Sequence, residues 1–469
     1  MGPLLRRKVR RVHFIAVGGI GMSGIAAVLL NQGFEVSGSD LRKGDTTNML
    51  EGLGAKIYIG HDAKQVHGAD VVVYSSAISV DNPEMQEARS LGIPLIPRAE
   101  MLAELMRMKS GIAVAGSHGK TTATSMLSWV LTKAGFDPTF VVGGRISTLA
   151  TNAQLGAGDY FVVEADESDG SFLKFSPVLS IVTNIDAEHL DYYHDIQNVK
   201  SAFLAFMNKV PFYGSTIVCL DDENILSVLS KIKRPVITYG FNRQARFRAE
   251  NLRYNGIHTS FEFFEEDVSL GDVTINIPGR HNVQNALSVL AAASQLGASM
   301  PVVIKALGDF AGVHRRFEFK GEAAEIQVVD DYGHHPSEIR AALEAARRSF
   351  AHNRIVAICQ PHRYTRLRDH LNEFAMSFHD ADMVVITDVY AASEKPIEDI
   401  SSERLFNMIR RHGHRDARYM PDKTKLATEL TGELKPGDIV ITFGAGDINR
   451  YGLEILEALR QQDTKGTDG

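Results

Sequence analysis

The sequence predicts an α/β protein of three domains, each built around a largely parallel β-sheet. Three observations support this fold class. A glycine-rich turn joins a strand to a helix near the start of the chain, and a second such turn begins at residue 116. From residue 326 onward, strands alternate regularly with helices, which is typical of doubly wound sheets. A chain of 469 residues has room for about three domains of ordinary size.

The composition is that of an ordinary globular protein, with 44% apolar and 23% charged residues. A net charge of −7 argues against nucleic acid as the main partner. No apolar run approaches the roughly 18 residues that span a membrane, and the basic start lacks the apolar core of a secretory signal. The two cysteines, Cys219 and Cys359, stand in apolar strand-like runs. We therefore expect buried thiols and a cytoplasmic location, whereas the composition carries no signal for the oligomeric state.

The first predicted domain covers residues 1–107 and opens with a nucleotide-binding fingerprint. A strand over 13–17 leads into Gly19-x-Gly21-x-x-Gly24, a helix over 25–32 and a second strand that ends at Asp40. In a Rossmann-like domain, such glycines admit a diphosphate and the acidic residue meets a ribose hydroxyl. The spacing leaves open an NAD-type cofactor, another nucleoside diphosphate, or a purely structural turn.

Two further places in this domain are candidates for substrate binding. Ser75 and Ser76 end the strand that starts at Val71, at the sheet edge where open α/β sheets bind ligands. Their hydroxyls could equally cap a helix. Arg98 begins the last helix of the domain.

The second predicted domain, residues 108–312, opens with a phosphate-binding loop. A buried strand over 112–115 leads into residues 116–122 (GSHGKTT), and a helical pattern follows. Helix-start N–H groups attract phosphate, Lys120 can reach the β- and γ-phosphates, and the Thr121 hydroxyl can bind Mg²⁺. The loop is shorter than the usual nucleotide loop, because Val114 stands where its first glycine is expected. The alternative is a tight turn with an exposed lysine.

Polar residues at two strand ends of this domain predict a Mg²⁺–ATP site. A strand over 160–163 leads into residues 164–169 (EADESD), and another over 180–183 leads toward His189. Carboxylate oxygens are preferred by Mg²⁺, which favours a metal site over solvated loop charges but makes His189 a weak candidate on residue type alone. Farther along, His281 and Asn285 lie one turn apart at a helix start, where they can hold a base or cap the helix.

The third predicted domain covers residues 313–469 and contains five strand–helix pairs. The strands are expected over 326–329, 355–359, 383–387, 418–420 and 439–443. Polar clusters follow three of them, over residues 330–336, 360–366 and 444–447. Arginines at the carboxyl edge of a sheet suit a carboxylate or phosphate, which they can pair in bidentate fashion. The pattern predicts a Rossmann-like domain that binds an acidic group.

Five of these motifs resemble those of the Mur ligase family, ATP-dependent enzymes that form amide bonds in peptidoglycan precursor synthesis. The likeness covers nearly the whole chain and is carried by residues 116–122, 164–169, 183–189, 279–285 and 330–336. Residues 18–24 and 360–366 are similar to those of family members that join L-alanine to UDP-N-acetylmuramate.

The resemblance implies that the three domains bind a UDP-sugar, ATP and an amino acid. It favours UDP-N-acetylmuramate over NAD at residues 19–40, with L-alanine as the second substrate and ATP with Mg²⁺, in two ions, as cofactors. Matching positions imply catalytic roles for Lys120, His334 and Arg363 and make Thr121, Glu164 and His189 metal ligands. The residues implied for ATP are Gly116, Ser117, His118, Gly119, Lys120, Thr121, Thr122, His281, Asn285, Arg316 and Asp330. Those implied for the two substrates are Gly19, Gly21, Gly24, Asp40, Ser75, Ser76, Arg98, Tyr332, His334, Arg363 and Arg366.

The implied reaction has two steps: ATP converts a carboxylate to an acyl phosphate, which an amine then attacks. One alternative is a relative that adds a peptide or another amino acid to the same sugar nucleotide. A second is a non-catalytic nucleotide-binding relative, which we would expect to lack Lys120, Glu164 or His189. A third, an NAD-dependent dehydrogenase, leaves the phosphate loop without a use.

Overall fold

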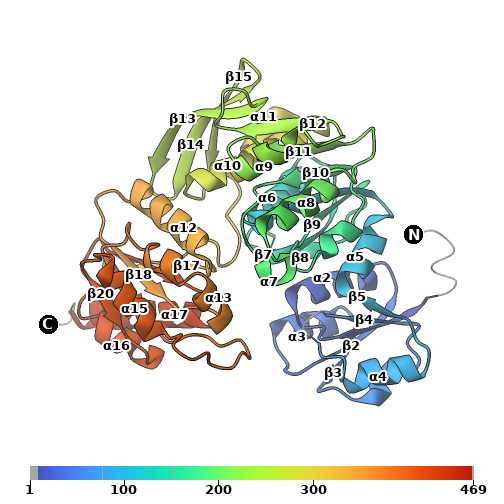
Figure 1. The fold of residues 1–469 in the computed structure, drawn as a ribbon, viewed down its shortest axis with the longest axis horizontal. Coiled ribbons are helices and arrows are strands. Elements are labelled where there is room, and N and C mark those ends of the chain that lie inside the picture. The colour runs from blue at the N-terminus through green and yellow to red at the C-terminus, as the bar shows by residue number, and fades with distance from the viewer. Residues whose placement is uncertain (1–8, 76–77, 150, 467–469) are drawn as a thin grey trace. The chain divides into compact units, whose positions relative to one another are not determined.

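The computed structural model describes residues 9–75, 78–149 and 151–466 (Figure 1). Within these ranges the chain forms sheets of five, ten and six strands, one in each predicted domain. By density of internal contacts the chain divides into two compact units. One contains Met1–Glu250, Glu262–Val273 and Gln284–Phe310, and the other contains Asn251–Phe261, Thr274–Val283 and Ala311–Gly469. The predicted α/β class is confirmed, whereas the boundaries at residues 107 and 312 stay predictions.

The first sheet is parallel throughout and has the strand order β3-β2-β1-β4-β5. Its strands are β1 (Arg11–Ile15), β2 (Glu35–Asp40), β3 (Lys56–Ile59), β4 (Val71–Tyr74) and β5 (Leu95–Pro97). They alternate with α2 (Ile20–Asn31), α3 (Asp45–Gly52), α4 (Pro83–Ser90) and α5 (Arg98–Met106). The strand order reverses between β1 and β4, so the turns after these two strands flank the crevice where such sheets bind ligands.

The second sheet has the strand order β15-β14-β13-β12-β11-β10-β6-β9-β7-β8. Its bounds are β6 (Ser110–Ala115), β7 (Thr139–Ile146), β8 (Thr151–Gln154), β9 (Tyr160–Glu164), β10 (Leu179–Val182), β11 (Ser215–Cys219), β12 (Val236–Gly240), β13 (Phe247–Asn255), β14 (His258–Glu265) and β15 (Val268–Ile275). Strand β6 lies in the interior of the sheet and pairs in parallel with β9 and β10. Residues 112–115 of β6 are completely buried, as expected for a strand covered on both faces.

The helices of this region are α6 (Lys120–Lys133), α7 (Leu190–Tyr193), α8 (Ile196–Met207), α9 (Glu223–Leu229), α10 (Arg280–Gln295) and α11 (Met300–Gly308). The parallel pairing brings the turn after β6 next to the turns after β9 and β10. These turns carry the phosphate loop and both polar clusters that the sequence analysis selected.

The third sheet has the strand order β16-β17-β21-β18-β19-β20. Its strands are β16 (Glu318–Ala323), β17 (Ile326–Asp331), β18 (Ile355–Cys359), β19 (Met383–Ile386), β20 (Ala417–Tyr419) and β21 (Ile439–Phe443). The helices include α12 (Pro336–Ser349), α13 (Tyr364–Asp369), α14 (Leu371–Ala375), α15 (Ser402–Arg411), α16 (Leu426–Leu430) and α17 (Ile448–Gly466). All five predicted strands are present.

The third sheet also contains a strand that was not predicted, β16, which runs antiparallel to β17 at one edge. Ala324 and Glu325 join the two strands with φ values of 49° and 58°. Two consecutive left-handed residues suit a tight hairpin, but the pair lacks the Asn-Gly or Asp-Gly signature that reveals such turns in a sequence. The hairpin was therefore not predicted.

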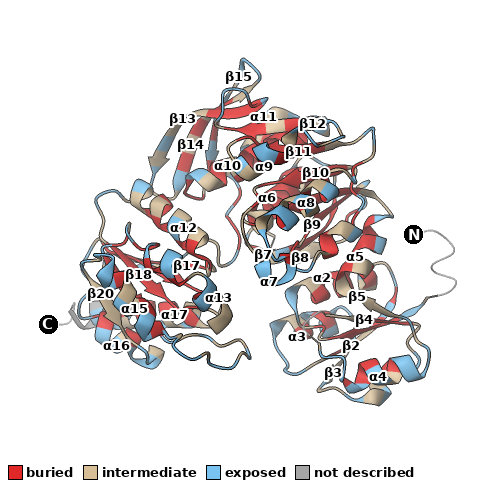
Figure 2. Cartoon of the chain, viewed as in Figure 1, coloured by how far each residue is buried: buried red, intermediate tan, exposed pale blue. Residues whose placement is uncertain are grey.

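The third sheet is buried on both faces, as Figure 2 shows for its central strands. Along β18, Ile355, Ala357 and Cys359 pack into one hydrophobic cluster, whereas Val356 and Ile358 pack into another. This alternation is the two-residue period of a strand between two helical layers. Both cysteines are buried and free of disulfides, as predicted.

Over the part of the chain that the structure describes, no helix combines the length and the apolar character that crossing a membrane requires.

Candidate functional site

The phosphate loop lies between β6 and the start of α6. Gly116 and Gly119 have φ values of 140° and 81°, which side chains disfavour. A Cβ atom would lie 2.0 Å from Thr183 Oγ1 at the first position and 2.6 Å from Asn285 Oδ1 at the second. The loop therefore requires glycine at both positions. It also brings Asn285, a predicted ATP ligand on α10, against Gly119.

The first half of the loop is tied to the turn after β10. The N–H groups of Ser117 and His118 donate to the carbonyl and side-chain oxygens of Asn184, at 3.2 and 2.8 Å. Thr183 Oγ1 donates to the carbonyl of His118 at 2.5 Å. These amides are engaged by the protein, so the groups that can face an anion are those at the start of α6. The first N–H groups of a helix have no partner within the helix and attract negative charge.

Lys120 is the first residue of α6, and oxygen atoms surround its ammonium group. Nζ donates to the carbonyls of Gly116 and Ser117, at 2.6 and 3.1 Å, and to Glu167 Oε1 at 2.8 Å. Burial by itself would lower the pKa of Lys120, but the charges of Glu167 and Asp166 outweigh burial and raise it. The loop thus holds a permanent cation at the position predicted for the phosphates.

The three predicted metal ligands divide between two groups. Thr121 Oγ1 donates to Glu164 Oε1 at 2.9 Å, so two of them are in contact. The third, His189, lies with Glu167 and Glu188, and one ligand atom from each of these residues is within 4.8 Å of the others. The structure therefore joins Glu167, which the sequence analysis did not select, to both Lys120 and His189.

The chemistry of the second group fits a divalent cation. Glu167 is 1% exposed, and its Oε2 has no hydrogen-bond partner among the residues that the structure describes. A buried carboxylate oxygen without a partner is unfavourable unless a cation neutralises it. Burial also raises the pKa of Glu167 to about 7, against the opposing charge of Lys120. The two carboxylates of this group match the oxygen ligands that Mg²⁺ prefers, whereas the imidazole of His189 is a nitrogen ligand, a type that Mg²⁺ does not prefer.

The glycines of the first domain lie at the start of α2. Gly19 precedes its first turn, and Gly21 lies against Arg98, whose Nη1 would be 2.6 Å from a Cβ atom at this position. Gly24 faces Val141 and Ala153 on β7 and β8. Gly24 therefore serves helix packing, whereas Gly21 lies close to Arg98, and the roles of both residues toward a substrate stay predictions.

Asp40 ends β2 and accepts a hydrogen bond from the N–H of Gly18 at 2.8 Å. It thus shapes the glycine turn in addition to any contact with a ligand. Ser75 follows β4, whereas Ser76 lies outside the described residues. Arg98 Nη2 is 3.8 Å from Asp166 Oδ2, which links the substrate candidates of the first sheet to the acidic segment after β9.

In the third domain, Asp330 is paired with an arginine that the sequence analysis did not select. Asp330 Oδ1 accepts from Thr442 Oγ1 at 2.7 Å and Oδ2 from Arg315 Nε at 3.0 Å. Arg315 also donates to the carbonyls of Gly444 and Gly446. The predicted ATP ligand Arg316 instead lies 3.4 Å from Glu338. Because the two arginines are adjacent in the sequence, only the path of the folded backbone determines which of them reaches Asp330.

Four rings form a row among the turns of the third domain. The centroids are 5.3 Å apart from Tyr332 to His334, 5.7 Å from His334 to His362, and 5.6 Å from His362 to Tyr390. Arg366 Nη1 is 3.2 Å from His362 Nδ1. We call these four rings the ring row. It contains the predicted substrate residues Tyr332 and His334, and adds His362 and Tyr390.

Both imidazoles of the ring row are neutral at pH 7. Burial, with the charge of Arg366, lowers the pKa of His334 to about 4 against the opposing charge of Glu338. Burial, His334 and Arg366 together lower the pKa of His362 to about 3. Neutral imidazoles beside arginine can accept a proton from an amine while the arginine binds a carboxylate.

The predicted ATP ligands fall in both compact units. Residues 116–122 and Asn285 belong to the first unit, whereas His281, Arg316 and Asp330 belong to the second. His281 lies one helical turn before Asn285 on α10. The roles of these residues toward ATP stay predictions.

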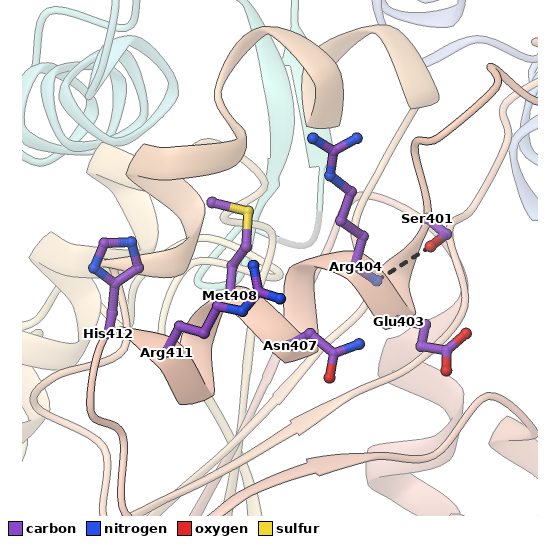
Figure 3. A pocket seen from close by; sticks show the side chains of 7 residues that line it. All are labelled: Ser401, Glu403, Arg404, Asn407, Met408, Arg411 and His412. Atoms are coloured by element: carbon purple, nitrogen blue, oxygen red, sulfur yellow. Dashed lines mark hydrogen bonds between the residues drawn. The ribbon is translucent and has the colours of Figure 1, made fainter.

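A separate hollow of about 580 Å³ lies along α15 (Figure 3). Arg404, Met408, Arg411 and His412 are among the residues that line it. Its lining belongs to the helix and its ends, and none of it to the turns that carry the predicted ligands. The hollow is therefore distinct from the candidate site.

The fold and the site together define a class of protein. A chain that combines a phosphate loop holding a lysine among carboxylates, a glycine-turn domain and a domain with arginine and imidazole groups is typical of a nucleotide-dependent α/β enzyme that transfers a phosphoryl group. Three family models match this chain. They are the Mur ligase family catalytic domain over residues 11–110, the Mur ligase middle domain over 114–293, and the Mur ligase glutamate ligase domain over 315–446.

Similar proteins agree with these models. The UDP-N-acetylmuramate–L-alanine ligase of Geobacter sp. (strain M21) is 53% identical over 453 residues, which cover 97% of this chain and 98% of that protein. The protein of the same name from Sorangium cellulosum is 51% identical over 95% of this chain and 96% of its own length. The chain belongs to the Mur ligase family, as its motifs predicted.

Solved structures show the same likeness. The UDP-N-acetylmuramate–alanine ligase MurC of Thermotoga maritima superposes with a TM-score of 0.82 at 29% identity, covering 96% of this chain and 99% of that one. A murein peptide ligase from Psychrobacter arcticus superposes with a TM-score of 0.70 at 25% identity and covers the same shares of the two chains.

Proposed function

We propose that this enzyme joins L-alanine to the lactyl carboxylate of UDP-N-acetylmuramate in peptidoglycan precursor synthesis, with ATP as the energy source. The observation that carries the proposal is the phosphate loop, in which Lys120 is held between the loop carbonyls and Glu167. Relatives that bear the name of this activity are 51 to 53% identical along almost the entire chain. We further propose that the reaction takes place in the cytoplasm.

The first step activates a poor electrophile. A carboxylate oxygen of the sugar acid attacks the γ-phosphorus of ATP, and the bond to the ADP oxygen breaks, which leaves an acyl phosphate. Negative charge must be neutralised during this transfer. Lys120 and the N–H groups at the start of α6 supply positive charge. Bound Mg²⁺, held by Thr121 with Glu164 and by His189 with Glu167 and Glu188, would supply further charge neutralisation.

The second step forms the amide. The neutral amine of alanine attacks the acyl carbon, a proton leaves the nitrogen, and phosphate is expelled. His334 is the proposed proton acceptor because it is uncharged at neutral pH and lies in the ring row near Arg366. Arg363 and Arg366 are proposed to bind the carboxylate of alanine, since guanidinium and carboxylate groups match in bidentate geometry.

A substrate comparison tests the proposal. ADP release should require both ATP and UDP-N-acetylmuramate and should be fastest with L-alanine among L-alanine, glycine, L-serine and a tripeptide. Mass spectrometry should find a uridine-linked product heavier by one alanyl residue. Faster turnover with the tripeptide would favour a peptide-adding relative, the activity named for the Psychrobacter structure. Oxidation or reduction of NAD under these conditions would instead indicate a dehydrogenase.

A second prediction concerns pH. Because burial lowers the pKa of His334 to about 4, its base form persists on acidification well below the ordinary histidine value. When kcat/KM for alanine is calculated on the neutral amine, it should stay flat from about pH 8 to pH 6 and fall only toward pH 4. His334→Gln should reduce kcat about 100-fold.

His352→Gln is the matched control, because His352 is exposed on the turn after α12. It should leave the rate and the pH profile unchanged. An inflection near pH 6.5 in the wild-type profile, removed by His334→Gln, would contradict the assignment of a lowered pKa.

A further inference from the structure

Arg363 has a backbone conformation that other parts of the chain must maintain. Its φ is 68°, in the left-handed region, and it directly precedes the first turn of α13. A side chain with a Cβ atom rarely adopts this conformation, which persists only where the surroundings enforce it. Strained residues of this kind occur often where a side chain must be aimed at a ligand. The question is therefore what holds Arg363 in place.

The enforcing contacts come from the segment between β19 and α15. The N–H of Arg363 donates to the carbonyl of Tyr390 at 2.9 Å, and the N–H of Tyr390 donates to the carbonyl of Pro361 at 2.8 Å. The ring of Tyr390 stacks on that of His362, with 9° between the planes. The two hydrogen bonds of Tyr390 thus hold the backbone on both sides of His362.

Glu394, farther along the same segment than Tyr390, adds two hydrogen bonds to these contacts. Its Oε2 accepts from the N–H of Thr365 at 3.1 Å, and its Oε1 accepts from Thr365 Oγ1 at 2.7 Å. Thr365 lies in the first turn of α13, so Glu394 caps the helix whose start carries Arg363. Ala392 and Ser393 have φ values of 47° and 71° and form the tight turn that directs Glu394 back onto the helix.

The electrostatics agree with this arrangement. Burial by itself would raise the pKa of Glu394, but the two hydrogen bonds from Thr365 and the charge of Arg363 outweigh burial and lower it. Glu394 is therefore ionised at neutral pH, and its charge-assisted hydrogen bonds are stronger than neutral ones. No ion pair between Glu394 and Arg363 is recorded among the described residues, so the link runs through Thr365 and the helix start.

We propose that Glu394 is a positioning residue for Arg363, because its bonds to Thr365 fix the start of α13 so that Arg363 faces the carboxylate of the amino-acid substrate. The inference rests on the proposed function, in which Arg363 binds alanine. Glu394 contacts no reacting atom in this account. It acts by maintaining the conformation of a residue that does.

The test compares variants in the alanine- and UDP-N-acetylmuramate-dependent release of ADP. Glu394→Ala should raise the KM for L-alanine about tenfold or more, since misplacing a binding group costs far more than its own contacts. The KM for ATP should change less than about twofold. Glu394→Gln keeps an oxygen for the N–H of Thr365 and an amide for its hydroxyl, so it should retain a KM for alanine within about threefold of wild type.

The matched control is Glu398→Ala, in the same segment, where the side chain is exposed. It should leave every KM unchanged. Thr365→Val removes only the hydroxyl bond and should raise the KM for alanine about threefold. If Glu394→Ala fails to fold in a thermal melt, Thr365→Val decides the matter, and an unchanged KM for alanine in that variant overturns the proposal.

A double-mutant cycle separates positioning from a general structural effect. If Glu394 acts through Arg363, adding Glu394→Ala to Arg363→Ala should change the KM for alanine less than about twofold. A full additional tenfold loss in that background would overturn the proposal, as would a loss in Glu394→Gln equal to that in Glu394→Ala. Failure of the wild type to use alanine would overturn the proposed function instead, so the two failures are distinguishable.

Discussion

Lys120→Ala should reduce the rate of alanine-dependent ADP release by about 1,000-fold or more. The ammonium group of Lys120 is held by two loop carbonyls and by Glu167, and its pKa is raised, so it is charged at any working pH. Under the proposed function, its loss removes the fixed cation beside the transferred phosphoryl group. The substitution also leaves the buried carboxylate of Glu167 without its ammonium partner. Steady-state ADP release with all co-substrates present measures the effect.

Lys133→Ala is the control for this experiment, since Lys133 lies in the last turn of α6 and its ammonium group covers the ring of Trp129 at 4.5 Å. This variant should keep nearly the wild-type rate. A thermal melt of both variants separates loss of chemistry from loss of structure. Turnover near the wild-type value in folded Lys120→Ala would refute the assignment of the phosphate loop.

Glu164→Gln should reduce kcat about 100-fold and raise the Mg²⁺ concentration needed for half-maximal activity about tenfold. Glu164 accepts hydrogen bonds from Thr121 Oγ1 and from the N–H of Gly143. A glutamine can keep part of this network while it removes the negative charge that a hard cation prefers. The Mg²⁺ concentration needed for half-maximal activity should therefore change, whereas the variant should keep its fold.

Binding of Mn²⁺, followed by electron paramagnetic resonance, provides a readout that does not depend on turnover. Asp159→Asn is the matched control, because Asp159 is exposed immediately before β9, at the opposite end of the same strand from Glu164. Equal Mn²⁺ affinity in Glu164→Gln and wild type would exclude Glu164 as a metal ligand.

Much of the fold could be predicted because its signals are local. Apolar runs gave strands such as β6 and β18, and glycine-rich turns marked the starts of α2 and α6. The parallel pairing of the five predicted strands of the third sheet followed from the alternation of strands and helices. The antiparallel strand β16 escaped prediction, since its hairpin residues Ala324 and Glu325 carry no turn signature.

In the candidate site, too, the contiguous motifs could be predicted from the sequence, whereas the contacts between distant residues could not. The phosphate loop, the acidic segment after β9 and the arginines of residues 360–366 are contiguous motifs, so they were selected directly. Glu167 stood within a selected motif, but its contacts with Lys120 and its position beside His189 depend on how three turns meet. The roles of the candidate site residues toward ATP, Mg²⁺ and the substrates stay predictions.

By itself, the sequence determined the α/β class, the family and the chemistry that the motifs can perform, because these depend on residue types at short spacings. Only the tertiary structure decided which charged groups pair. In the structure, Asp330 pairs with Arg315 and not with the adjacent Arg316. Glu394 forms hydrogen bonds with Thr365, which is 29 residues away in the sequence. Such choices follow from strand order and backbone direction, which set distances between residues far apart in sequence. A local pattern contains no information about them.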